Sequence, residues 1–87
     1  MSKAGLIQLT RVLARGFAPD IRVNAIAPGT VLPPADYTPA QVESLRGRTP
    51  LQRIGSPADV VRALLYLIDA DYVTGEVMVV DGGRLLV

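Results

Sequence analysis

Cysteine, histidine and tryptophan are all missing from the 87 residues, and lysine and phenylalanine each occur once. Without cysteine the chain can form no disulfide and has no thiolate nucleophile. Without histidine it lacks the side chain most often used as a general base and as a metal ligand. Its carboxylates are spread along the chain without metal-ligand spacing. We therefore expect no metal site.

An excess of charge of one sign is also lacking. The net charge is +1 and the nine basic residues are scattered, which argues against a nucleic-acid partner and against a polybasic membrane-binding segment. No apolar run is long enough to cross a bilayer, and the first residues do not resemble a signal peptide. We therefore expect a cytoplasmic protein with neither a membrane nor a nucleic-acid partner.

The length fits one small domain or a part of a larger one. A chain of this size buries only about two-thirds of the surface of its unfolded state. Hydrophobic residues nevertheless make up 49% of it, and the mean hydropathy is +0.33. Some apolar surface is therefore expected to face a partner, another subunit or a missing part of the fold.

A stretch over 21–31 organises the chain, because an apolar, β-branched strand runs into Pro28 and Gly29. Such strand ends are where open α/β sheets bind ligands. Helical spacing of apolar residues and helix-start signals define the flanking elements. The expected order is a helix over 2–17, a strand over 21–27, a proline-rich lid with a short helix over 39–46, a helix over 57–68 and a strand over 76–80.

Three further expectations follow from these patterns. Two strands joined by a crossover helix should pair in parallel, giving an α/β fold. The helix over 57–68 is apolar around most of its circumference and should be covered on several sides. In the helix over 2–17, the core stripe is predicted to contain Leu6, Leu9 or Thr10, Leu13 and Phe17, broadened by Ile7 and Ala14.

Short motifs follow one another in an order and spacing that resemble the short-chain dehydrogenase/reductase family. They match about the carboxyl-terminal third of a member. The resemblance implies that 1–87 is a carboxyl-terminal fragment of a Rossmann-type, doubly wound parallel sheet, and that the helix over 2–17 starts earlier in a longer protein. The motifs are Ser2-Lys3-Ala4-Gly5, the stretch over 21–29, the stretch over 55–60, the stretch over 72–76 and Val80-Asp81-Gly82-Gly83.

Two segments, over 28–34 and 48–55, look like the bacterial pteridine-reductase-like branch. This resemblance implies an NAD(P)H-dependent oxidoreductase that transfers hydride to a C=N or C=O bond of a small-molecule substrate of the dihydropteridine or dihydrofolate type. It also favours NADPH over NADH. Many members carry a threonine at the position of Pro33, where its hydroxyl helps hold the cofactor. That contact should be missing here.

Lys3 matches the lysine of the family's Tyr-x-x-x-Lys motif, whose tyrosine would precede Met1. The resemblance implies a catalytic lysine that binds the cofactor ribose and lowers the pKa of the tyrosine. Taken alone, Lys3 would be a solvated residue at a helix end. The resemblance further implies that a cofactor-binding segment meets the nicotinamide and that two lid residues meet the substrate. The cofactor-binding residues are Pro28, Gly29, Thr30 and Val31, and the substrate-binding residues are Leu32 and Tyr37.

Other polar and aromatic residues are expected to be structural. Asn24 should bond a neighbouring loop, Asp59 should stabilise a helix start, and Asp81 should form a turn. None of the tyrosines has a lysine four residues on, so none replaces the missing one. Tyr66 is expected in the core and Tyr72 at a turn.

The sequence contains no glycine-rich turn between a strand and a helix, so it offers no site for a cofactor pyrophosphate. An alternative to an enzyme part is therefore an inactive fragment that acts at most as an oligomerisation module. The family resemblance implies a homo-oligomer, a dimer or a tetramer. A small unrelated α/β domain is the third interpretation.

Overall fold

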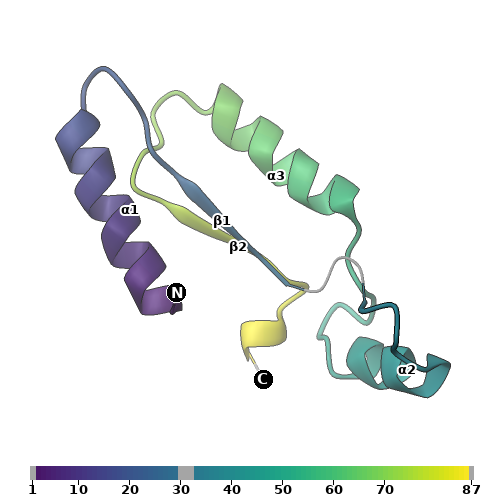
Figure 1. Ribbon diagram of the computed structural model, residues 1–87. Coiled ribbons are helices and arrows are strands. Elements are labelled where there is room, and N and C mark those ends of the chain that lie inside the picture. Colours follow the sequence, from purple (N-terminus) through teal and green to yellow (C-terminus); the bar gives the residue numbers. More distant parts are fainter. Residues whose placement is uncertain (1, 30–32, 87) are drawn as a thin grey trace.

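A computed structural model gives the structure of the protein and describes residues 2–29 and 33–86. Figure 1 shows three α-helices, two strands and a short 3₁₀ helix. In chain order they are α1 (Lys3–Phe17), β1 (Ala25–Pro28), α2 (Pro39–Gly47), α3 (Pro57–Asp69), β2 (Val77–Val80) and the 3₁₀ helix η1 (Arg84–Leu86).

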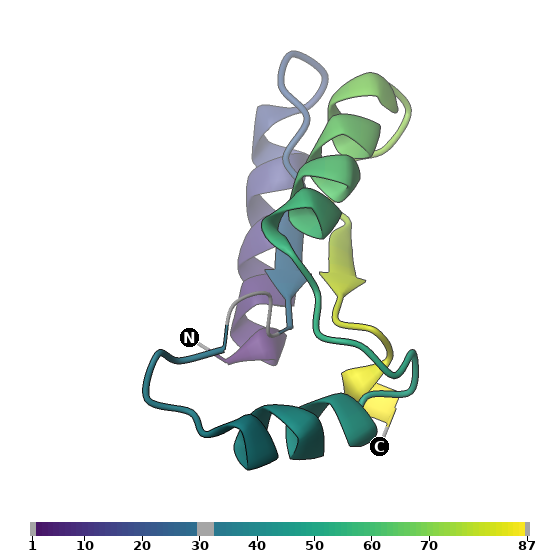
Figure 2. The ribbon, with the colours of Figure 1, turned by 90° about the vertical axis from the view of Figure 1, so that its right-hand side faces the viewer.

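The two strands are parallel neighbours, as predicted. Ala25 lies opposite Val77 and Pro28 lies opposite Val80. Both α1 and α3 pack against both strands, and they lie on opposite sides of the sheet (Figures 1 and 2). The result is a helix–sheet–helix arrangement that corresponds to part of a Rossmann-type fold.

The limits of β1 differ from the predicted strand over 21–27. The strand begins four residues later and includes Pro28. The backbone N–H of Ala25 donates to Glu76 at 2.9 Å, and that of Gly29 donates to Val80 at 2.8 Å. Because alternate residues of a parallel strand face alternate edges, the nitrogen of Pro28 faces away from β2 and breaks no bond to it.

Side chains extend the pairing on the amino-terminal side of β1. The guanidinium of Arg22 donates to the carbonyls of Leu67 at 2.8 Å, Ala70 at 2.9 Å and Ile68 at 2.9 Å. These carbonyls belong to the last turn of α3, where backbone acceptors lack helical partners. Arg22 therefore fixes the end of α3 to the start of β1.

Asn24 has the structural role predicted for it. Its side-chain amide donates to the carbonyl of Val73 at 3.0 Å, and its side-chain oxygen accepts from the N–H of Glu76 at 3.0 Å. The asparagine thus acts as a bridge between β1 and the loop that leads into β2.

The core face of α1 is narrower than predicted. Thr10 and Ala14 are buried, whereas Leu13 and Phe17 are exposed. Thr10 satisfies its hydroxyl by donating to the carbonyl of Leu6 at 2.7 Å. Small side chains let the helix backbone approach the sheet closely, so the helix turns this face inward and leaves the larger side chains outside.

The predicted all-round burial of α3 is wrong. Ala63 and Leu67 are buried, but Leu65, Tyr66 and Ile68 are 57–61% exposed. Tyr66 is therefore not a core residue, and Tyr72 is fully exposed. Two strands form a narrow surface, which can cover only one strip of a helix.

The molecule is extended for its mass. It exposes 6222 Å², whereas a compact protein of 9.3 kDa exposes about 5,000 Å². Its radius of gyration is 15.2 Å, against about 12 Å for a compact chain of this length. The predicted surplus of apolar surface is thus visible on α1 and α3.

The short helix α2 projects beyond the carboxyl ends of the strands (Figures 1 and 2). It begins where predicted, because the Thr38 hydroxyl accepts from the N–H of Gln41 at 3.1 Å and the Gln41 side chain accepts from the N–H of Thr38 at 2.7 Å. Among the described residues no helix is long and apolar enough to cross a membrane.

We predict that Arg22→Ala lowers the free energy of unfolding by about 1–2 kcal/mol, because several carbonyls of α3 lose a charged donor. Urea denaturation followed by circular dichroism measures the change. Arg11→Ala is the matched control, since Arg11 is an exposed arginine of α1 and should change stability by less than about 0.5 kcal/mol. Equal losses in the two variants would contradict this role of Arg22.

Candidate active site

A cavity of about 570 Å³ lies at the carboxyl ends of the strands and brings together three of the residues predicted from sequence, Lys3, Pro28 and Gly29. Lys3 comes from the start of α1, and the other two come from the end of β1. The remaining lining residues are Ser2, Leu6, Ala27, Leu45, Asp81, Arg84 and Leu85.

Lys3 is placed by the capped first turn of α1. The Ser2 hydroxyl accepts from the N–H of Gly5 at 3.0 Å, which satisfies one of the free donors of the helix start. Lys3 is exposed on this turn. None of the ion pairs in the described part of the chain involves Lys3. Its ammonium can therefore bind a ligand in the cavity without first breaking an ion pair.

Gly29 lies against the turn that follows β2. A Cβ atom built on Gly29 would stand 2.8 Å from Cβ and 2.9 Å from Cα of Asp81. Only glycine allows this approach without movement of one backbone. The neighbour that makes this approach is Asp81; the contact of Gly29 with a cofactor stays a prediction.

Asp81 forms a turn, as predicted. Its carboxylate accepts from the N–H of Gly83 at 2.9 Å and from the N–H of Leu85 at 3.1 Å. The residues after it hold the end of the lid, because the N–H of Leu51 donates to the carbonyl of Gly82 at 2.9 Å. Gly82 has a φ of +66° and packs against Thr49.

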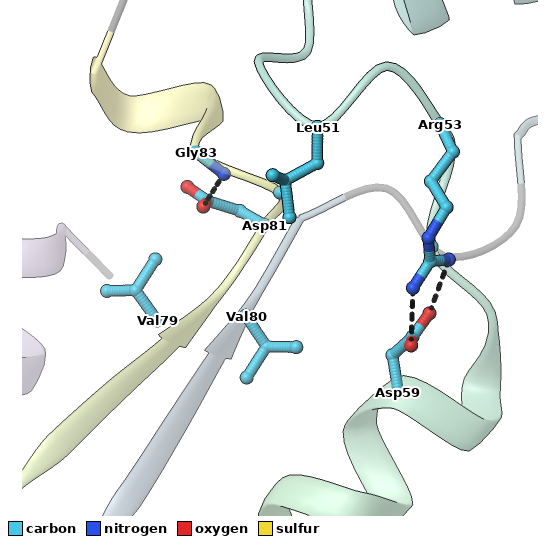
Figure 3. Close-up of a pocket in the computed structure, with 9 residues that line it drawn as sticks. Leu51, Arg53, Asp59, Val79, Val80, Asp81 and Gly83 are labelled. Carbon is cyan, nitrogen blue, oxygen red and sulfur yellow. Dashed lines mark hydrogen bonds and ion pairs between the residues drawn. The ribbon is translucent and has the colours of Figure 1, made fainter.

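A second cavity, of about 370 Å³, lies on the other side of the same turn, between Asp81 and the start of α3 (Figure 3). Its charged residues are Arg53, Asp59 and Asp81. The guanidinium of Arg53 binds the carboxylate of Asp59 through two contacts, at 2.8 and 3.0 Å. This charged pair is satisfied internally and offers no free group to a ligand.

Asp59 does more than the helix-start role predicted for it. Its carboxylate accepts from the N–H of Ser56 at 2.7 Å, which is the predicted role, and also from Arg62 at 2.6 Å. The bond from Arg53, the Ser56 N–H and the bond from Arg62 hold the pKa of Asp59 well below its ordinary value. The side chain is only 12% exposed, so the cluster fixes the loop before α3.

Four further site residues were predicted from the sequence, and the structure describes one of them, Tyr37. Thr30, Val31 and Leu32 lie outside the described residues. Tyr37 is 40% exposed in the loop before α2 and lines neither cavity. Arg84 lines the first cavity, but it was not predicted as a site residue. The one signal in the sequence was its position directly after the Asp-Gly-Gly turn.

The first cavity fits one part of a nicotinamide cofactor. An ammonium from Lys3 and a backbone without a side chain at Gly29 suit the ribose and the ring that follows it. The sequence offers no glycine-rich turn for a pyrophosphate. Within residues 2–29 and 33–86 no group of three or more acidic side chains could hold a metal ion.

Comparison with known proteins gives a family match over nearly the whole chain. The family described as "Enoyl-(Acyl carrier protein) reductase" matches residues 1–84. The carbonyl reductase family member 4 of Danio rerio is 46% identical over 87 residues, which cover 98% of this chain and 36% of the relative. The human 3-oxoacyl-[acyl-carrier-protein] reductase is 42% identical over 88 residues, which cover 99% and 36%. The chain thus spans about a third of the length of these relatives.

Comparison with solved structures also gives matches over nearly the whole chain. A small-chain dehydrogenase in complex with NADPH superposes with a TM-score of 0.85 and 38% identity, covering 97% of this chain and 41% of that one. A 4-hydroxyisoleucine dehydrogenase complexed with NADH gives 0.86 and 34%, covering 98% and 38%. A short-chain dehydrogenase of Leptospira borgpetersenii with bound NAD⁺ gives 0.81 and 40%, covering 94% and 33%. The names of these neighbours include NADPH, NADH and NAD⁺.

Gly82→Ala should destabilise the protein by about 1–2 kcal/mol or more, because an L-residue at this φ is strained and the added Cβ would lie 2.7 Å from Cγ2 of Thr49. Gly16→Ala is the control: nothing lies within 4 Å of its added Cβ, and alanine inside a helix should stabilise by up to about 1 kcal/mol. Thermal unfolding measures both effects: the melting temperature should fall in Gly82→Ala and rise in Gly16→Ala. A stabilised Gly82→Ala would contradict the clamp between this turn and the lid.

Asp59→Asn should lower stability at neutral pH, and the difference from the wild type should shrink on acidification. Since the folded-state pKa lies below the ordinary value of 3.8, the carboxylate stabilises the fold fully above 3.8, and this effect is lost progressively as the pH falls from there through the folded-state pKa. Unfolding free energies between pH 7 and pH 2 test the trend. Asp36→Asn, on an exposed residue, should change stability little at pH 7. A gap that stayed constant with pH would refute the cluster's role.

Proposed function

This chain belongs to the short-chain dehydrogenase/reductase family, a family of oxidoreductases, and from that membership we propose that it forms the carboxyl-terminal part of an NAD(P)H-dependent reductase subunit. The observation that carries the proposal is the cavity in which Lys3, Pro28 and Gly29 meet at the carboxyl ends of two parallel strands. Binding at this edge is the rule for open α/β sheets.

In this proposal Lys3 is the catalytic residue of the chain. Its ammonium binds the ribose hydroxyls, and its positive charge favours the phenolate form of a tyrosine supplied by the part of the subunit outside this chain. A phenol with a lowered pKa can exchange a proton with a carbonyl or imine near neutral pH. The nicotinamide, when bound, supplies the hydride.

Pro28, Gly29, Thr30 and Val31 form the proposed nicotinamide wall. Pro28 offers an apolar ring that has no N–H to solvate, and Gly29 lines the same cavity next to it. Leu32 and Tyr37 are proposed to contact the substrate from the lid. For these two, and for Thr30 and Val31, the support is the family resemblance of their positions.

The substrate is proposed to be a C=O or C=N compound. The names of the relatives favour a carbonyl: one is a carbonyl reductase and one is a 3-oxoacyl-carrier-protein reductase. The motifs over 28–34 and 48–55 favour a dihydropteridine or dihydrofolate, with NADPH as the donor. Reduction of a β-ketoacyl thioester and of dihydrobiopterin, each with NADPH and with NADH, decides between them.

The proposal also includes a cytoplasmic homo-oligomer, a dimer or a tetramer. Its support is the exposed apolar surface of α1 and α3, where Val12, Phe17, Leu65 and Ile68 are 49–61% exposed. Surfaces of this kind mark protein contacts more often than free solvent faces. Analytical ultracentrifugation of the complete protein measures the assembly.

The test uses the complete protein, encoded by the reading frame that contains these 87 residues. Lys3→Ala should lower its kcat/KM by about 10²-fold or more, since both cofactor binding and proton transfer lose a cation. NADPH oxidation followed by absorbance measures it, and Arg11→Ala is the control with little change. The 87-residue chain expressed alone should neither bind nor oxidise NADPH. Turnover by the isolated chain would overturn the view that it is one part of the enzyme, and full activity of Lys3→Ala would overturn the role of Lys3.

A further inference from the structure

Three charged side chains line the Lys3 cavity: Lys3, Asp81 and Arg84. Asp81 is committed to its own turn, since both carboxylate oxygens accept backbone N–H groups, from Gly83 and from Leu85. The lining therefore holds two cations and one carboxylate whose oxygens are already bound by backbone N–H groups. Its net positive charge favours an anionic ligand.

Arg84 is held in place by the backbone rather than by its head group. Its N–H donates to the carbonyl of Asp81 at 3.2 Å, and the N–H of Leu86 donates to Gly83 at 2.8 Å. The turn itself is fixed against β1, because Gly29 and Asp81 are in close approach. Arg84 is half-buried at the start of η1. Its main chain is thus ordered before any ligand binds, which lowers the cost of binding.

The guanidinium of Arg84 is available to a ligand. In the part of the chain that the structure describes, the ion pairs are Arg46 with Glu43, and Arg53 and Arg62 with Asp59. Arg84 takes part in none of these ion pairs. Its side chain also makes no hydrogen bond to the residues that form them. A guanidinium offers two parallel N–H donors that match a carboxylate or a phosphate.

We propose that Arg84 is a substrate-specificity residue that binds a carboxylate or phosphate group on the molecule to be reduced. The proposal rests on the function proposed above, which assigns Lys3 to the cofactor and so leaves Arg84 for the substrate. Most of the remaining lining is apolar and includes Leu6, Leu45 and Leu85. The substrate class is therefore a carbonyl or imine compound with a short apolar segment that ends in an anionic group.

The test uses the complete protein and two substrate pairs that differ only in the anion. One pair is acetoacetate and its methyl ester; the other is acetoacetyl-phosphopantetheine and acetoacetyl-pantetheine, which lacks the phosphate. Arg84→Gln should lower the ratio of kcat/KM for the anionic over the neutral member about 10- to 100-fold. An effect confined to the first pair assigns the anion to the substrate itself, and one confined to the second assigns it to a carrier arm.

A binding measurement separates this proposal from the proposed function. Glutarate is titrated calorimetrically into Lys3→Gln protein and into the Lys3→Gln, Arg84→Gln double variant, with no cofactor present. The single variant should bind at least tenfold more tightly, and adding Arg11→Gln to Lys3→Gln in place of Arg84→Gln should have no effect. Equal binding by the single and double variants would overturn the role of Arg84 whatever the enzyme's activity. Failure of the wild type to reduce any of these four compounds would instead count against the proposed reductase.

Discussion

The parallel pairing of β1 with β2 is the constraint on which the rest of the structure depends. Because the strands run the same way, the loop after Pro28 and the turn at Asp81 leave the sheet at one edge. Four residue pairs make a short ladder, so Arg22 and Asn24 extend it with side-chain bonds to α3 and to the loop before β2. The strand register, fixed in this way, decides which side chains can meet at the cavity.

The close approach of Gly29 to Asp81 turns this edge into a site. The turn after β2 does three things at once: it packs on β1, it holds the lid through the bond between Leu51 and Gly82, and it presents Arg84. Lys3 reaches the same cavity from the capped start of α1. Lys3 and Arg84, the groups proposed to meet the cofactor and the substrate, therefore reach one cavity from two different elements, while α2 projects beyond this edge of the sheet (Figure 2).

Sequence patterns over a few residues predicted the helix caps correctly, whereas several contacts between distant residues were not predicted from the sequence. The caps at Thr38 and Asp59 depend on residues three positions apart, so their sequence patterns suffice. Of the core stripe predicted for α1, Thr10 and Ala14 are buried, but the prediction was wrong for Leu13 and Phe17, because the sheet packs against the small side chains of the helix. Arg22 was missed because its acceptors lie more than forty residues away, and the resemblance, not periodicity, placed Lys3.

Pro28 has a further consequence for the outer edge of β1. Its nitrogen faces away from β2, as do the backbone groups of the other even-numbered positions such as Ile26. In the described part of the chain no strand pairs with that edge. Any parallel strand that joins there can receive a bond at Ile26 but not at Pro28, which has no donor. The outer ladder of β1 would therefore lose one donor at Pro28, which is the end of the strand where Lys3, Pro28 and Gly29 line one cavity.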